Sequence, residues 1–215
     1  ALAYRLPDGT LASRSFTTYA SHHGPIVAER GGRWIAEALM SKPVPALEQS
    51  WLRTKAHDLT SYMQVAERQA NSSNDTLFAD AKGEIAYLHP QFVPVRDDRF
   101  DYTHAVDGAD PATDWNGLHT VASLPNAINP GIGWVRNTND WPWSAAGPDS
   151  PKAKDYPRYM DQFGPNQRGV HADLLLTGHR DFTPQRLIAA AYDSYLPAFA
   201  ELIPPLVKAY DTLPS

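Results

Sequence analysis

Proline is the residue type that most restricts what this chain can fold into. Nineteen of the 215 residues are proline, which is about 9% of the chain where about 5% is usual in proteins. Each proline fixes φ and removes a backbone hydrogen-bond donor, so regular helices and strands rarely continue through one. The sequence therefore predicts short helices and strands separated by much ordered loop.

Composition excludes several classes of protein. Hydrophobic residues make up 42% of the chain and aromatic residues 11%, which is enough for a packed core and excludes general disorder. The formal net charge is -5 with neither sign gathered into a block, so we expect no nucleic-acid partner. No apolar run approaches the roughly 20 residues of a membrane helix, and the first residues lack the pattern of a secretory signal, so we expect no membrane partner. The absence of cysteine excludes disulfides, thiol catalysis and cysteine-ligated metals.

Two β-hairpins are predicted in the first 96 residues. Residues 14–20 alternate with β-favouring side chains, and residues 26–28 resume the pattern after a His-Gly-Pro break, which indicates a hairpin region. A second hairpin is predicted where the apolar runs Thr76–Ala79 and Ile85–Leu88 flank a turn that contains Gly83.

The spacing of apolar residues predicts two helices between these hairpins. The first helix follows Pro45, and the second runs from Leu59 towards Ala70 with Asp58 or Thr60 as its N-cap.

Beyond the second hairpin, the chain is predicted to change from loop to helix. Residues 97–165 carry few periodic runs and many turn-forming residues, which predicts a long ordered loop layer with one short strand at Trp134 and Val135. The remainder is predicted to be helical, starting at an N-cap at Thr183, with interruptions at Pro197 and again at the Pro204-Pro205 pair.

Familiar metal and nucleotide motifs are absent from the sequence. The eight histidines show no H-E-x-x-H motif and no close ligand pair on one helix face, so we predict no metal site. Residues 107–114 space three aspartates roughly as a calcium loop does, but the segment lacks the glutamate at loop position 12 and contains a proline, so we interpret it as turn chemistry. The chain also lacks G-x-S-x-G, P-loop and G-x-G-x-x-G motifs.

Five segments occur in the order that is typical of one family of hydrolases: residues 23–27 (HGPIV), 74–87 (NDTLFADAKGEIAY), 94–96 (PVR), 115–118 (WNGL) and 129–142 (NPGIGWVRNTNDWP). Together they resemble the β-chain of penicillin acylases and related N-acyl-homoserine lactone acylases, which are N-terminal nucleophile (Ntn) hydrolases. Residues 155–176 are also similar to this family, so the resemblance covers most of the chain.

The resemblance implies hydrolysis of an amide bond in a small N-acyl substrate. In this family an N-terminal Ser, Thr or Cys, released by autoproteolysis of a precursor, attacks the amide and uses its own α-amine as the base. A free α-amine has a pKa near 8, close to operating pH, so no separate histidine is needed. Ala1 carries no nucleophile, so we expect an internal fragment of the β-chain that is inactive alone, with the α-chain and the N-terminal part of the β-chain as its partners.

The resemblance also implies a fold and a compartment. We expect an α+β fold in which antiparallel strands pack on helices, as part of an αββα sandwich. A single fragment is expected, divided into a strand and helix core (1–96), a loop-rich layer (97–165) and a helical C-terminal part (166–215). A periplasmic or secreted location follows from the family alone. No cofactor is expected, although some relatives bind structural calcium.

Asn74 is the residue that the resemblance assigns to the oxyanion site. In much of the family the asparagine stands five residues before the Asp of the Ala-Asp pair, and that position here is Asp75. A carboxylate would repel a developing oxyanion, whereas an amide N–H donor stabilises it. We therefore assign the role to Asn74. The alternative interpretation is that Asn74 caps the turn that opens the strand.

Four further residues are assigned from the resemblance. Arg96 matches an arginine that orients the site around the nucleophile, and its alternative is a surface arginine paired with one of the two aspartates that follow it. His23 and Ile26 lie on the segment that runs beside the acyl pocket in relatives, although a structural role for His23 is equally open. Trp141 is expected to narrow that pocket.

Two other functions are open at this point. Four tryptophans could form an aromatic platform for a sugar or another planar ligand, which would place several exposed rings in one plane. These are Trp115, Trp134, Trp141 and Trp143. The chain could also belong to an inactive structural relative of the acylases.

Overall fold

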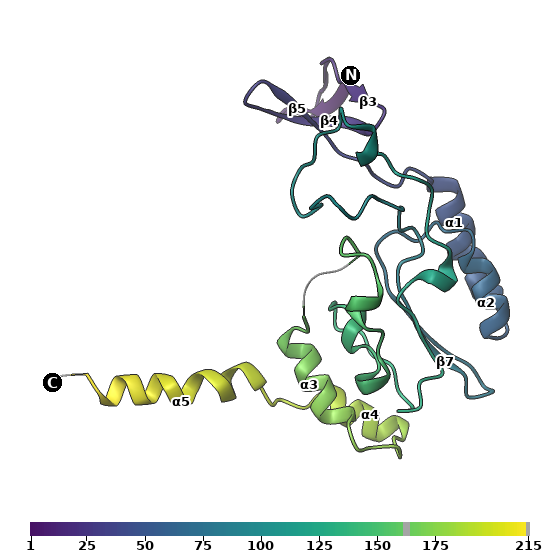
Figure 1. Ribbon diagram of the computed structural model, residues 1–215. Coiled ribbons are helices and arrows are strands. Elements are labelled where there is room, and N and C mark those ends of the chain that lie inside the picture. Colours follow the sequence, from purple (N-terminus) through teal and green to yellow (C-terminus); the bar gives the residue numbers. More distant parts are fainter. Residues whose placement is uncertain (161–163, 214–215) are drawn as a thin grey trace. The chain divides into compact units, whose positions relative to one another are not determined.

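The computed structural model describes residues 1–160 and 164–213, which form two compact units (Figure 1). Unit 1 combines Ala1–Ser41 with Phe100–Asp114, and unit 2 combines Lys42–Arg99 with Trp115–Ser215. Every strand pair among the described residues is antiparallel, and helices accompany the strands. The fold is α+β, as predicted from the sequence.

Unit 1 is built on short strands. These are β1 (Leu2–Arg5), β2 (Leu11–Arg14), β3 (Ala20–Ser21), β4 (Gly24–Arg30) and β5 (Arg33–Ala36). Strands β1 and β2 form one hairpin, and β3, β4 and β5 form a second antiparallel sheet in that order. The turn between β4 and β5 contains Gly31 and Gly32 at φ values of 57° and 74°, a left-handed conformation that glycine adopts without steric cost. Hairpins are therefore present in the predicted region, but residues 15–19 of the first predicted run form no strand, because β2 ends at Arg14 and β3 begins at Ala20.

The loop of unit 1 at Phe100–Asp114 is held by turn chemistry. Asp107 accepts a hydrogen bond from the backbone N–H of Ala109, and Asp110 accepts one from Ala112 at the start of the 3₁₀ turn η2 (Pro111–Thr113). Both carboxylates therefore close their own turns, as we interpreted from the sequence.

Helices α1 (Pro43–Leu52) and α2 (Leu59–Ala66) open unit 2, with the 3₁₀ turn η1 (Arg53–Lys55) between them. Asp58 is the N-cap of α2, as predicted, and forms a capping box with Ser61. Helix α2 ends earlier than predicted. Gln69 has a φ of 50°, which is incompatible with continuing a right-handed helix to Ala70.

The sheet of unit 2 contains β6 (Thr76–Ala79), β7 (Ile85–Leu88) and β8 (Ala127–Ile128) in that order. The predicted β6–β7 hairpin is confirmed. The strand predicted at Trp134 and Val135 is wrong, because neither residue lies in a strand. The third strand of the sheet is β8. The neighbouring Arg136 N–H bonds the carbonyl of Ala145, so this backbone pairs within the loop layer.

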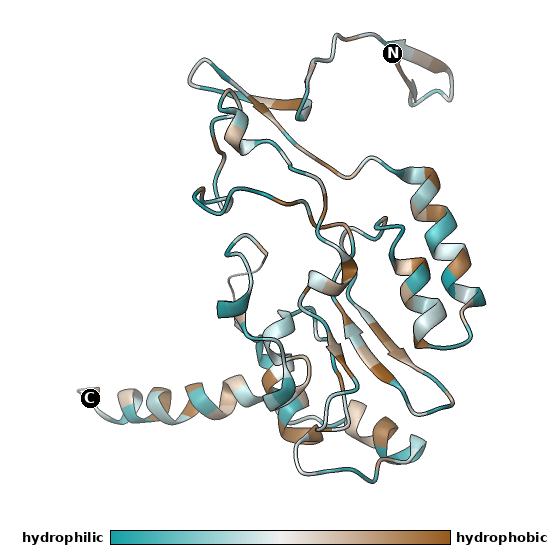
Figure 2. Cartoon of the chain, turned by 45° about the vertical axis from the view of Figure 1, so that its right-hand side comes forward, coloured by the Kyte–Doolittle hydropathy of each residue, from teal (hydrophilic) through white to brown (hydrophobic). Residues whose placement is uncertain are grey.

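Strand β7 is buried on both faces, and its alternating side chains join two clusters. Ala86 and Leu88 pack with Leu59 of α2, and partly buried Tyr62, Met63 and Phe78 surround them. The cluster on the other face comprises Tyr87, Ala127, Ala145 and Ala146, with Ile132 and Val135 packed against it. Helix α2 therefore covers one face of the hairpin and the loop layer covers the other (Figure 2).

The loop layer of unit 2 is ordered by short 3₁₀ turns. These are η3 (Val121–Ser123), η4 (Pro142–Ser144), η5 (Gly147–Asp149) and η6 (Ala153–Asp155). Proline starts or lies near the start of two of them, η4 and η5, where a missing N–H costs no helical hydrogen bond.

Three helices follow the loop layer: α3 (Gln167–Leu176), α4 (Pro184–Ala191) and α5 (Pro197–Asp211). Thr183 caps α4 and Pro197 begins α5, as predicted. The interruption predicted at Pro204 and Pro205 is wrong, because α5 continues through both residues. The two prolines remove only two N–H donors from a helix that is mostly exposed to solvent. None of the helices in the described part of the chain is long and apolar enough to cross a membrane.

Candidate functional site

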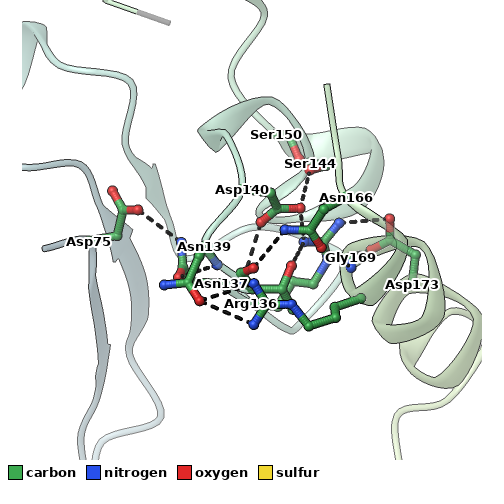
Figure 3. Close-up of polar contacts among 12 residues, drawn as sticks. Asp75, Arg136, Asn137, Asn139, Asp140, Ser144, Ser150, Asn166, Gly169 and Asp173 are labelled. Atoms are coloured by element: carbon green, nitrogen blue, oxygen red, sulfur yellow. Dashed lines mark hydrogen bonds and ion pairs between the residues drawn. The ribbon is translucent and has the colours of Figure 1, made fainter. Parts of the chain in front are cut away.

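A buried arginine organises the polar site of unit 2 (Figure 3). The side chain of Arg136 is 5% exposed and forms ion pairs with two carboxylates. Its Nη1 donates to Asp140 Oδ2 at 2.7 Å, and its Nε and Nη2 donate to the two oxygens of Asp173 at 2.7 and 2.9 Å. The pairing with Asp173 is bidentate, the geometry in which a guanidinium matches a carboxylate best.

Mutual pairing keeps this cluster ionised despite its burial. Burial alone would raise the pKa of Asp140, but the hydrogen bond and charge of Arg136 outweigh it, so the pKa of Asp140 is lowered. Burial would likewise lower the pKa of Arg136, but its hydrogen bonds to Asp173 and Asp140 outweigh that effect, so its pKa is raised. Both groups therefore stay charged at neutral pH.

Helix α3 approaches this cluster closely because its first turn contains Gly169. A Cβ atom at that position would lie 2.3 Å from Asp140 Oδ2 and 2.9 Å from Arg136 Nη1. Asn166 caps α3 by accepting a hydrogen bond from the Gly169 N–H, and its own amide donates to the carbonyl of Thr138. The start of α3 is thus joined to the loop that carries Arg136.

Asn137 links this loop to the mouth of the β6–β7 hairpin. Its Nδ2 donates to Asp75 Oδ2 at 2.9 Å, and Asp75 Oδ1 lies 3.3 Å from His89 Nδ1. Asp75 directly precedes β6 and His89 directly follows β7. Because Thr76 pairs with Leu88, the antiparallel register places the aspartate opposite the histidine.

The predicted oxyanion residue lies next to this network. Asn74 is exposed, and its backbone carbonyl accepts a hydrogen bond of 2.7 Å from Asn71 Nδ2. The side chain that contacts Asn137 belongs to the adjacent Asp75. These contacts describe the chain without substrate, so the role of Asn74 stays a prediction, as does its alternative as a turn cap.

Arg96 is half-buried and lies beside two aromatic rings. Its guanidinium carbon is 5.8 Å from the centre of the Trp115 ring and 6.0 Å from that of Tyr159, distances typical of cation–π contacts. Of the two aspartates that follow it, Asp97 pairs with Arg99 and Asp98 with Arg158. The role of Arg96 in orienting the site stays a prediction.

The structure places the other predicted residues in different surroundings. Trp141 is half-buried and directly follows Asp140, at the N-cap position of η4 in unit 2. His23 and Ile26 are half-buried residues of unit 1. His23 Nε2 is 2.8 Å from the carbonyl oxygen of Gly108 in the same unit. The pocket roles of Trp141, His23 and Ile26 stay predictions.

Sequence reasoning missed the most highly connected residues of the site. It did not identify Arg136, Asp140 and Asp173, because the arginine and the second aspartate are 37 residues apart and no short motif joins them. The placement of Asp75 opposite His89 could have been predicted, since both residues flank the strands of the predicted hairpin and its register sets them opposite each other.

The four tryptophans do not form the aromatic platform of the alternative function. All four are half-buried, and they pack against different neighbours. The Trp115 ring contacts Phe92 edge-on, and Trp143 packs against Tyr156 at 5.5 Å between ring centres. An exposed row of coplanar rings is therefore not observed among them.

Comparison with known proteins identifies the family. A family model described as penicillin amidase matches residues 7–214. Penicillin G acylase of Escherichia coli is 29% identical to this chain over 171 residues, which cover 76% of this chain. The matched part spans 19% of the length of that relative. Because the family model matches nearly the whole sequence, the chain belongs to the penicillin amidase family.

Proposed function

We propose that this chain is part of an acylase, an amidohydrolase that cleaves the amide bond of an N-acyl substrate such as a β-lactam or an acyl-homoserine lactone. The observation that carries this proposal is the family match over residues 7–214. The name of the E. coli relative, a penicillin G acylase, supports the same reaction class.

The nucleophile of the proposed enzyme comes from other parts of the polypeptide. The chain matches only 19% of the length of its relative, so most of a complete acylase lies outside the matched segment. In this proposal the α-chain and the N-terminal part of the β-chain, which carries an N-terminal nucleophile released by autoproteolysis, complete an αββα sandwich. The 215-residue chain alone is then inactive, and the complete enzyme is periplasmic or secreted.

Exposed apolar residues on the last two helices support a partner of this kind. Helices α4 and α5 present large side chains to solvent, including Leu187, Ile188, Phe199, Leu202, Leu206 and Tyr210, each more than half exposed. Large exposed apolar surfaces are uncommon on monomeric proteins and are typical of interaction sites.

Within the enzyme, the chain supplies groups that surround the nucleophile. The Asn74 amide donates a hydrogen bond to the tetrahedral oxyanion, and Arg96, held against Trp115 and Tyr159, orients neighbouring polar groups. His23, Ile26 and Trp141 keep the substrate-binding roles that the resemblance implies.

The test compares the complete polypeptide with the 215-residue chain. Each is incubated with N-acyl amides that carry phenylacetyl, long aliphatic or dicarboxylic acyl groups, and release of the free amine is measured. We expect hydrolysis by the complete polypeptide only. A complete polypeptide that is processed and folded but hydrolyses none of these amides would identify an inactive relative, and hydrolysis by the 215-residue chain would overturn the assignment of the nucleophile to other segments.

A further inference from the structure

Unit 1 contains two histidines and an aspartate whose side chains converge. His22 and His23 occupy the tight turn between β3 and β4, and Asp114 ends the loop of the same unit. Ligand atoms from the three residues all lie within 4.8 Å of one another. His22 Nε2 is 3.1 Å and His23 Nδ1 is 3.6 Å from the same oxygen, Asp114 Oδ1.

These separations suit a bound metal ion. Zn²⁺ binds imidazole nitrogen and carboxylate oxygen at about 2.0–2.2 Å, which in tetrahedral geometry separates the ligand atoms by about 3.4 Å. The observed separations of 3.1 and 3.6 Å lie on either side of that value. The side chain of His22 is 66% exposed and that of Asp114 is 46% exposed, so water can complete the coordination.

The hydrogen bond of His23 to Gly108 fixes which ring nitrogen of His23 faces Asp114. His23 Nε2 lies 2.8 Å from the Gly108 carbonyl oxygen, which can only accept, so Nε2 carries the proton. Nδ1 is therefore the ring nitrogen that faces Asp114, at 3.6 Å from its Oδ1. A metal ion between this nitrogen and the Asp114 carboxylate is also within reach of His22.

The same contact resembles the way proteins orient metal-binding histidines. The ring nitrogen that does not bind the metal commonly donates to a backbone carbonyl, which fixes the tautomer and the ring orientation. The close approach requires a glycine at position 108, because a Cβ atom there would lie 2.8 Å from His23 Nε2.

We propose that His22, His23 and Asp114 form a binding site for a divalent transition metal of the zinc class. Two imidazole nitrogens and one carboxylate suit Zn²⁺, whereas Ca²⁺ prefers six to eight oxygen ligands. Among the described residues, this is the one group of three or more His, Cys, Asp or Glu side chains whose ligand atoms all lie within 4.8 Å of one another. The ion joins the β3–β4 turn to a loop that lies 92 residues away in the sequence.

Sequence spacing could not reveal this site. The two histidines are adjacent in a turn rather than spaced along a helix, and the third ligand is distant in the chain. Our sequence-based expectation of no metal site is therefore replaced by this proposal.

Isothermal titration of the full 215-residue chain with ZnCl₂ tests the proposal. We expect one Zn²⁺ per chain, and Co²⁺ bound in its place should give visible absorption bands. The variants His22→Ala, His23→Ala and Asp114→Ala should each lower the Zn²⁺ affinity by more than about 100-fold, and Gly108→Ala, which displaces the His23 ring, by about 10–100-fold.

A second histidine and aspartate pair in unit 1 provides the control. His104 Nδ1 lies 3.1 Å from Asp101 Oδ2, but in the part of the chain that the structure describes no third histidine or acidic ligand joins this exposed pair. His104→Ala should leave the Zn²⁺ affinity unchanged. Circular dichroism of each variant separates loss of a ligand from loss of the fold, and Gly108→Ala provides a reading that leaves all three ligands in place.

Three outcomes would overturn the proposal. The first is absence of Zn²⁺ binding to the folded wild-type chain. The second is equal binding by the wild type and the folded variants of all three ligands. The third is displacement of Zn²⁺ by an equal concentration of Ca²⁺, since a site with two imidazole ligands discriminates strongly against calcium.

Discussion

At the scale of single residues, the buried ion pairs of unit 2 matter more for stability than its exposed ones. Arg136 is 5% exposed, and the side chain of Asp140 is 2% exposed. Removing one member of a buried ion pair leaves the other charge uncompensated, which costs about 3–5 kcal/mol. The ion pair between Arg99 and Asp97, where the arginine side chain is 75% exposed, is screened by solvent and contributes little.

Asp140→Asn should weaken the fold in a pH-dependent way. The pKa of Asp140 is lowered in the folded chain, so the unfolded chain binds more protons below the ordinary aspartate pKa of about 3.9. The stabilising effect of the ionised Asp140 carboxylate is complete above that pH and is lost as the pH falls towards the folded-state pKa of Asp140. We expect the variant to lose about 3 kcal/mol of unfolding free energy at neutral pH, and the two stability curves to converge in acid. Urea unfolding measured across the acidic range checks this expectation, and parallel curves would contradict it.

Asn74→Ala in the complete enzyme tests the predicted oxyanion residue. If the Asn74 amide stabilises the oxyanion, its loss should lower kcat by about 10²–10³ with little change in KM, because the interaction is formed only in the transition state. Unfolding free energy should change little, since the hydrogen bond from Asn71 is accepted by the backbone carbonyl of Asn74, which alanine keeps. Steady-state kinetics with the best amide substrate gives both constants.

The matched control for that experiment is Asp75→Asn at the adjacent position. Asparagine keeps an oxygen that can accept the hydrogen bond from Asn137 but removes the negative charge near His89. Unchanged kcat in Asn74→Ala together with altered kcat in Asp75→Asn would move the oxyanion role to position 75.

At the scale of elements, local signals were readable from the sequence and long-range pairing was not. The β6–β7 hairpin and the start of α2 depend on residues close together in the chain, such as Gly83 and Asp58, and both were predicted correctly. Strand β8 pairs with β7, which lies about forty residues earlier in the chain. Because β8 is only two residues long, it carries no periodic pattern of its own. The same limit explains why Trp134 and Val135 were assigned to a strand.

Ser61→Ala should destabilise α2 by about 1 kcal/mol, because it removes the serine half of the capping box while the Asp58 cap stays in place. The Ser61 hydroxyl accepts hydrogen bonds from the backbone N–H groups of His57 and Asp58, and the Ser61 N–H donates to the Asp58 carboxylate. Thr60→Ala is the control, because the sequence also allowed Thr60 as the cap and the structure gives that role to Asp58. Urea unfolding should show a clear loss for Ser61→Ala and almost none for Thr60→Ala, and equal losses would contradict the capping geometry.

At the scale of the whole molecule, the α+β class and the loop-rich character followed from the sequence, whereas the grouping into two units did not. Unit 1 includes Phe100–Asp114, which lies within the predicted loop layer. The carbonyl of Gly108 in that loop accepts the hydrogen bond from His23. A contact across 85 residues depends on chain topology rather than on any local pattern. The ligand group of His22, His23 and Asp114 escaped sequence analysis for the same reason.

The apolar surface of α5 should make the isolated chain self-associate. Leu202, Leu206 and Tyr210 follow one another at intervals of four residues, which places them on one face of the helix, and they are 63%, 67% and 73% exposed. Burial of apolar area is worth roughly 25 cal/mol per Å², so covering this face favours association. Sedimentation velocity over a range of concentrations should show oligomers, and the double variant Leu202→Gln/Leu206→Gln should shift the distribution towards monomer.

Leu11→Gln is the control for this experiment, because Leu11 on β2 is 74% exposed but stands outside α5. It should leave the association unchanged. In the complete enzyme the α5 double variant should also lower the yield of assembled protein, since the same face then loses contact with the remaining segments. A wild-type chain that stays monomeric at every concentration would show that this face needs no partner, and it would remove the structural support for placing the chain within a larger acylase.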